Sequence, residues 1–78
     1  MASTFEMVRQ RLADQMDVDA NTITLATNIT DDLGADSLDA VELIIALEDE
    51  LKITIDIDDA EQLKTVGDVV ELVDRLIG

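Results

Sequence analysis

Apolar residues recur at helical spacing near both ends of the chain. At the start, Phe5, Val8, Leu12 and Met16 lie three or four positions apart, which predicts a first helix over residues 4–16. Residues 3–6 (Ser-Thr-Phe-Glu) match a capping box, and residues 65–68 (Thr-Val-Gly-Asp) form a similar start with Asp in place of the usual Glu. The apolar face expected for the last helix consists of Val66, Val69, Val70, Val73, Leu76 and Ile77.

The central helix, predicted over residues 37–51, has apolar residues on two opposite sides. Asp36 is the expected N-cap, with Asp39 in the third helical position. One side carries Ala40, Ile44, Leu47 and Leu51, with Leu43 at its edge. The nearly opposite side carries Leu38, Val41 and Ile45, flanked by Glu42, Glu48 and Asp49. A helix in a small bundle needs only one buried stripe, so the second side is a candidate docking surface for a basic partner. Alternatively, neighbouring elements pack against both sides.

The connections between these helices are longer and less regular. Residues 17–36 are rich in Asp, Asn and Thr and predict a long loop. The apolar residues expected to pin this loop to the core are Val18, Ile23, Leu25, Ile29 and Leu33. Residues 52–57 alternate like a strand but have no strand to pair with, so we expect an extended linker followed by a short helix near 58–63. The fold class is therefore all-α: a small antiparallel bundle of three main helices plus one short helix.

Composition adds a strong charge asymmetry to this picture. The chain has 78 residues, which predicts one small domain over 1–78, and it is 47% hydrophobic, too apolar for a disordered acidic tail. Its net charge of −14 should repel nucleic acid and anionic lipid and favour partners with basic patches. No run of about 18 apolar residues exists to span a membrane, and no cysteine is present. We expect a soluble, monomeric, cytoplasmic protein.

Ser37 is the most conspicuous candidate for chemistry, yet nothing near it in the sequence could activate its hydroxyl. The chain lacks histidine and cysteine, and no lysine or arginine lies between Arg11 and Lys52. A Ser-His-Asp arrangement is thus excluded, and no catalytic residue is expected. By position alone, Ser37 is an ordinary residue of a helix start. A serine that is exposed at a helix start and cannot react unaided is also a suitable site for another enzyme to attach a group.

The surrounding octet, Asp-Leu-Gly-Ala-Asp-Ser-Leu-Asp over residues 32–39, closely resembles the prosthetic-group site of acyl carrier proteins. The resemblance extends over nearly the whole chain, including Glu48-Asp49-Glu50-Leu51 and Thr65-Val66. It implies that Ser37, between Asp36 and Leu38, carries 4'-phosphopantetheine, installed from coenzyme A by a phosphopantetheinyl transferase. The thiol of that group would hold acyl chains as thioesters for fatty acid synthesis enzymes. The implied docking residues are Leu38, Val41, Glu42, Ile45, Glu48 and Asp49.

The chain departs from the family pattern in three places, and other functions stay open. One is the linker, where Ile53 and Ile57 add apolar character. Asp17 stands where the family often has glycine, and Asp56 where many members have proline. The strong acidity and the Gly-Ala-Asp-Ser-Leu form favour the discrete carriers of bacterial fatty acid synthesis. A carrier for polyketide or other dedicated acyl chemistry is one alternative, and a noncovalent acidic helical adaptor is another. A calcium loop beginning at Asp17 lacks the required glycine at Thr22, so no specific metal site is expected.

Overall fold

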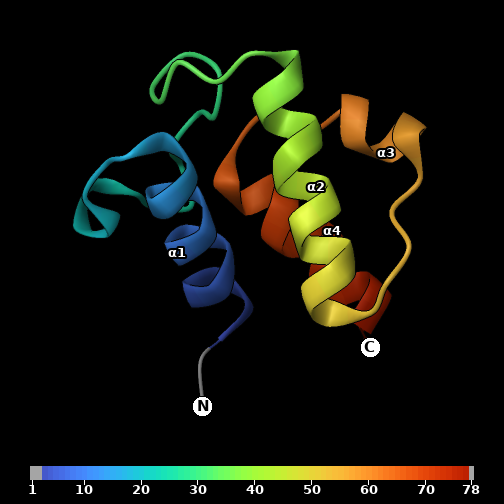
Figure 1. Ribbon diagram of the computed structural model, residues 1–78. Helices are drawn as coiled ribbons and strands as arrows, with labels where there is room; N and C mark the ends of the chain where they lie inside the picture. Colours follow the sequence, from blue (N-terminus) through green and yellow to red (C-terminus); the bar gives the residue numbers. More distant parts are fainter. Residues whose placement is uncertain (1–2, 78) are drawn as a thin grey trace.

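The computed structural model describes residues 3–77, and its elements are all helical (Figure 1). The long helices are α1 (Thr4–Met16), α2 (Ser37–Leu51) and α4 (Val66–Ile77). A 3-10 turn, η1 (Ala20–Thr22), lies in the loop after α1, and α3 (Ile57–Glu61) is a short helix between α2 and α4. The predicted all-α fold with three main helices and one short helix is confirmed, with α3 beginning and ending slightly earlier than expected.

Side-chain contacts between α1 and its neighbours define an antiparallel bundle. Gln15, near the end of α1, donates from Nε2 to the carbonyl of Asp39 in the first turn of α2 at 2.6 Å. Thr4, at the start of α1, bonds to Asp74 near the end of α4. Both α2 and α4 therefore run opposite to α1 and parallel to each other, as the ribbon shows (Figure 1).

The core is aliphatic and lies where the three long helices meet. Its fully buried side chains include Val8 and Leu12 of α1, Leu47 of α2 and Val69 of α4. A second, smaller cluster joins Ile44, Ile55 and Leu72 beneath the linker that leads to α3. Burial of these side chains supplies most of the free energy that stabilises a chain without disulfides.

The predicted apolar face of α4 is correct in its first turns and wrong in its last one. Val66, Val69 and Val73 are fully buried, but Leu76 and Ile77 are 42% and 52% exposed. Because Asp74 already lies beside the first residue of α1, the final turn of α4 extends past the start of its neighbour. Leu72, which the predicted face omitted, is instead 5% exposed and packs under the linker.

The long loop is attached to the start of α4 mainly through its backbone. The amide of Ile29 donates to the Lys64 carbonyl, and the amides of Val66 and Gly67 donate to the carbonyls of Thr27 and Leu25, all at 2.9 Å. Ile23 and Ile29 are buried as predicted, whereas Leu25 is 52% exposed, so that anchoring prediction is wrong. Leu25 is held by its carbonyl oxygen, which would lie 3.0 Å from a Cβ at Gly67.

The linker between α2 and α3 is extended, as predicted, and forms no strand. Among residues 3–77 the β-pairing consists of one isolated bridge between Asn28 and Thr65. The strand-like alternation instead reflects two inward side chains, Ile55, which is 7% exposed, and the half-buried Ile53, with exposed Thr54 between them. No helix in the described part of the chain is long and apolar enough to cross a membrane.

Candidate functional site

Ser37 is the first residue of α2, and local hydrogen bonds fix the turn that displays it. Asp36 caps the helix by accepting a bond from the Asp39 amide at 2.9 Å, while the Asp39 carboxylate accepts from the Asp36 amide at 3.1 Å. The predicted capping box is thus complete. Gly34 adopts φ 74, a left-handed conformation that glycine reaches without steric cost. Ala35, 3% exposed, anchors the turn to the core through a bond to the Ile29 carbonyl.

The hydroxyl of Ser37 is exposed and makes no hydrogen bond to the part of the chain that the structure describes. The ionisable side chains of its own turn are the carboxylates of Asp36 and Asp39, which are occupied by the reciprocal capping bonds. In the described part of the chain, no side chain makes a hydrogen bond to the hydroxyl that would activate it for attack. The exposed hydroxyl is therefore accessible to an external enzyme.

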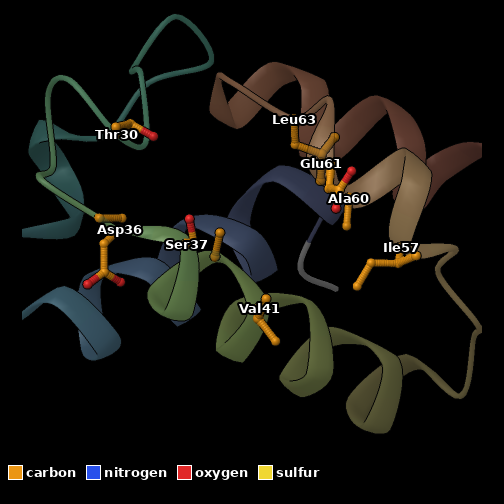
Figure 2. Close-up of a pocket in the computed structure, with 10 residues that line it drawn as sticks. Thr30, Asp36, Ser37, Val41, Ile57, Ala60, Glu61 and Leu63 are labelled. Carbon is orange, nitrogen blue, oxygen red and sulfur yellow. The ribbon is translucent and has the colours of Figure 1, made fainter.

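A cavity of about 450 Å³ opens beside Ser37, between α2, α3 and the end of the long loop (Figure 2). This volume is within the range of small-molecule sites. Figure 2 shows Ser37 and Val41 on α2, with α3 and Leu63 on the opposite side of the cavity. The residues lining it are Thr30, Ala35, Asp36, Ser37, Ala40, Val41, Ile57, Ala60, Glu61 and Leu63.

The second apolar side of α2 is exposed. Leu38, Val41 and Ile45 are 64%, 39% and 58% exposed, so neither the loop nor another helix covers them. The alternative in which α2 is packed on both sides is therefore wrong. Of the flanking acids, Glu42 and Asp49 are exposed. Hereafter Leu38, Val41 and Ile45 are called the apolar strip.

Glu48, the third flanking acid, differs from the other two because its carboxylate already has a partner. It is half-buried, and its Oε2 accepts a hydrogen bond from the Ile55 amide at 2.8 Å. The periodicity of α2 placed Glu48 beside the apolar strip but could not show this bond, which spans seven residues and depends on the path of the linker. Glu48 thus binds the linker as well as bordering the strip.

Ile57 lines the site, although the sequence analysis noted it only for its apolar character near the linker. It begins α3, is 62% exposed and lines the cavity together with Val41 and Ala60. The expectation of a linker ending at residue 57 obscured its place, although its apolar character next to three acids, Asp56, Asp58 and Asp59, was a usable signal.

Comparisons with known proteins agree with this geometry. A family model described as a phosphopantetheine attachment site matches residues 6–73. Acyl carrier proteins from three strains of Clostridium perfringens are 52% identical over 69 residues, which is 88% of this chain and 91% of each relative.

Solved structures that share the fold include two with sequence identities above 30%. One is described as a candidate acyl carrier protein from Mycobacterium tuberculosis and superposes with a TM-score of 0.88 at 38% identity, covering 94% of this chain and 97% of that one. The other is the acyl carrier protein of Enterococcus faecalis, described as having high thermal stability. Its TM-score is 0.81 at 34% identity, covering 94% and 92% of the two chains.

Proposed function

Because this chain belongs to the acyl carrier proteins, which bear a 4'-phosphopantetheine group, we propose that Ser37 is the residue to which that group is attached. Membership of the family makes the protein a carrier for fatty acid synthesis and not an enzyme, which removes the noncovalent adaptor from consideration. The observation that supports Ser37 is its exposed, unpaired hydroxyl at the first residue of α2, beside a cavity.

The surroundings of Ser37 fit a phosphodiester with one charged oxygen. The N-terminus of α2 presents unpaired backbone N–H groups and the positive end of the helix dipole, both of which favour an anion. Asp36 and Asp39 oppose this by repulsion, although each already accepts a backbone bond. The prosthetic group supplies a thiol that holds acyl groups as thioesters. Asp36 and Leu38 flank the attachment point, and the cavity walls offer aliphatic contact to the cargo.

The apolar strip and its carboxylates form the proposed docking surface for partner enzymes. Burial of Leu38 and Ile45, both more than half exposed, supplies affinity, and Glu42 and Asp49 attract basic residues of the partner. The proposed partners are a phosphopantetheinyl transferase and fatty acid synthesis enzymes with basic patches. The composition supports a monomeric, cytoplasmic carrier domain.

The attachment is tested by mass spectrometry of the intact protein. Incubation of the unmodified chain with coenzyme A and a broad-specificity transferase should add the mass of one phosphopantetheine. The same treatment of Ser37→Ala should add nothing, because its turn has lost the nucleophilic oxygen. Circular dichroism of Ser37→Ala serves as the folding control. A full mass gain in a folded Ser37→Ala variant would place the group elsewhere.

The docking surface is tested at Glu42, because this exposed acid has no hydrogen-bond partner in the described chain. Glu42→Lys should slow acyl transfer from partner enzymes about tenfold at low salt, since it reverses one charge at the interface. Rising salt should narrow the difference from the wild type. Glu71→Lys on α4 provides the matched control with the same change in net charge. Equal slowing by both variants would show an effect of total charge and refute the surface.

A further inference from the structure

Helix α3 forms one wall of the cavity and makes few contacts with the rest of the molecule. Helix α3 has five residues, and its N-cap Asp56 makes no side-chain capping bond. An isolated helix of this length is unstable in water, so contacts outside the helix must hold it. Within residues 54–63, the backbone bonds of Ala60, Gln62 and Leu63 all stay inside the segment.

A single side chain connects this segment by hydrogen bonding to the long helices. Among the described residues, the bond from the Ile55 amide to Glu48 Oε2, at 2.8 Å, is the one that links residues 54–63 to another element. Just outside this segment, the Ile53 amide donates to the Glu48 carbonyl and the Lys64 carbonyl accepts from the Ile29 amide. The bond to Glu48 Oε2 is charge-assisted and half-buried, which makes it stronger than a bond between neutral groups in water. Next to it, the Ile55 side chain packs against Ile44 of α2 and Leu72 of α4.

Two residues after Ile55, the chain enters the cavity wall. Ile57, Ala60 and Leu63 line the cavity from one side, while Ser37 and Val41 line it from α2 (Figure 2). The position of α3 therefore sets the width of the cavity, and the bond to Glu48 fixes the end of the linker from which α3 starts. Release of that bond leaves the segment held by its apolar contacts and by the backbone bonds of Ile53 and Lys64 just outside it.

We propose that Glu48 is a positioning residue that ties the linker to α2 and so keeps α3 in place as a wall around cargo attached at Ser37. The part concerning cargo rests on the function proposed above, whereas the tie itself does not. This role differs from docking because it needs an acceptor oxygen at position 48 and not a negative charge. Glutamine supplies such an oxygen without the charge, which separates the two roles experimentally.

The tie is tested on the unmodified protein by amide hydrogen exchange, which requires neither a transferase nor cargo. Glu48→Ala should speed exchange of the Ile55 amide and of α3 by about tenfold, because a hydrogen bond to a charged group is lost. Glu48→Gln keeps the acceptor oxygen and loses only the charge assistance, so it should speed exchange clearly less than Glu48→Ala does. Asp49→Ala removes a neighbouring charge without touching the linker, so exchange of the Ile55 amide and of α3 should match the wild type.

Two exchange results would overturn the tie. One is unchanged exchange at Ile55 in Glu48→Ala. The other is equal acceleration in Glu48→Ala and Glu48→Gln, which would assign the effect to charge. Amides of α1 and α4 serve as internal references, and acceleration spread uniformly over them would show general destabilisation and also refute the tie.

The consequence for cargo is tested with the octanoyl thioester of the phosphopantetheinylated protein. A group that contacts the native state but not the unfolded chain raises the melting temperature. The rise from the thiol form to the octanoyl form should be the same in the wild type and Glu48→Gln, and at least halved in Glu48→Ala. An equal rise in all three proteins, zero included, would overturn the role in cargo retention. If loading at Ser37 fails altogether, the attachment proposal falls, and the exchange experiment still decides the tie.

Discussion

At the scale of single residues, two helix ends adopt a left-handed backbone without glycine. Asp17, which ends α1, has φ 56, and Lys52, which ends α2, has φ 57. The left-handed turn lets the next amides, those of Val18 and Ile53, donate to the carbonyls of Ala13 and Glu48, which closes each helix end. An L-residue pays a steric penalty in this conformation that glycine avoids. Both positions are therefore sites of stored strain, in contrast to Gly34.

Asp17→Gly should stabilise the protein by about 0.5–1 kcal/mol, because removal of the Cβ clash exceeds the added flexibility of the unfolded chain. Urea unfolding followed by circular dichroism measures the change. Loss of one negative charge alone would also stabilise so acidic a chain, and Asp17→Ala controls for this effect because it keeps the Cβ. An alanine variant as stable as the glycine variant would assign the whole gain to charge.

At the scale of elements, each long helix begins at a four-residue capping signal. Ser3 accepts from the Glu6 amide at 3.2 Å, the box of Asp36 and Asp39 is complete, and Thr65 accepts from the Asp68 amide at 3.1 Å. These signals are local in sequence, so the starts of all three helices and the display of Ser37 were predictable without the structure. The two faces of α2 were predictable for the same reason, since they follow from helical periodicity alone.

What the sequence did not predict depends on contacts between distant segments. Leu25 has the same apolar side chain as its buried neighbours, but only the backbone contact with Gly67 decides that it stays outside. The exposure of Leu76 depends on where α1 begins relative to the end of α4. The bond between Glu48 and the linker is of the same kind. Periodicity assigns a residue to a face, and the tertiary path of another segment decides what that face meets.

The N-terminal cap of α4 makes the stability of the fold depend on pH. The pKa of Asp68 lies below its ordinary value of 3.8, first because the carboxylate accepts a bond from the Thr65 amide and next because it accepts one from Lys64. The folded state then binds fewer protons than the unfolded state between the two pKa values. The resulting stabilisation is complete above the unfolded pKa and is lost as the pH falls through the lower, folded one.

Asp68→Asn should therefore reduce the loss of stability between about pH 5 and about pH 2, because asparagine keeps an acceptor oxygen but does not titrate. Urea unfolding at several pH values measures the slope. Glu71→Gln removes one charge from the same helix without touching the cap and is the matched control. If Asp68→Asn and Glu71→Gln reduce the loss of stability at low pH equally, the cap is not the cause of that loss.

At the scale of the whole molecule, negative charge is concentrated and largely unpaired. The chain has 19 acids and 5 bases, and among residues 3–77 one ion pair forms, between Arg11 and Glu50 at 2.5 Å. The pKa of Arg11 is raised above its ordinary value, first by its hydrogen bond to Glu50. Both side chains are about 40% exposed, at 40% and 43%, so the pair adds little stability. The excess negative charge that attracts basic partners therefore also destabilises the fold of the free protein by repulsion.

Screening this repulsion should stabilise the fold, and divalent cations should do so more effectively than sodium. Among the described residues no cluster is arranged to hold a metal ion, so we expect diffuse binding with a gradual response and not a saturable site. The melting temperature should rise as sodium chloride increases from about 10 to about 150 mM, over which the Debye length falls from about 30 to about 8 Å. Replacement of sodium by millimolar magnesium at fixed ionic strength should raise it further, because each divalent ion neutralises two carboxylates. An unchanged melting temperature after that replacement would contradict cation association and leave screening alone. No rise with sodium chloride itself would show that the unpaired acids are too far apart, or too well hydrated, to destabilise the bundle.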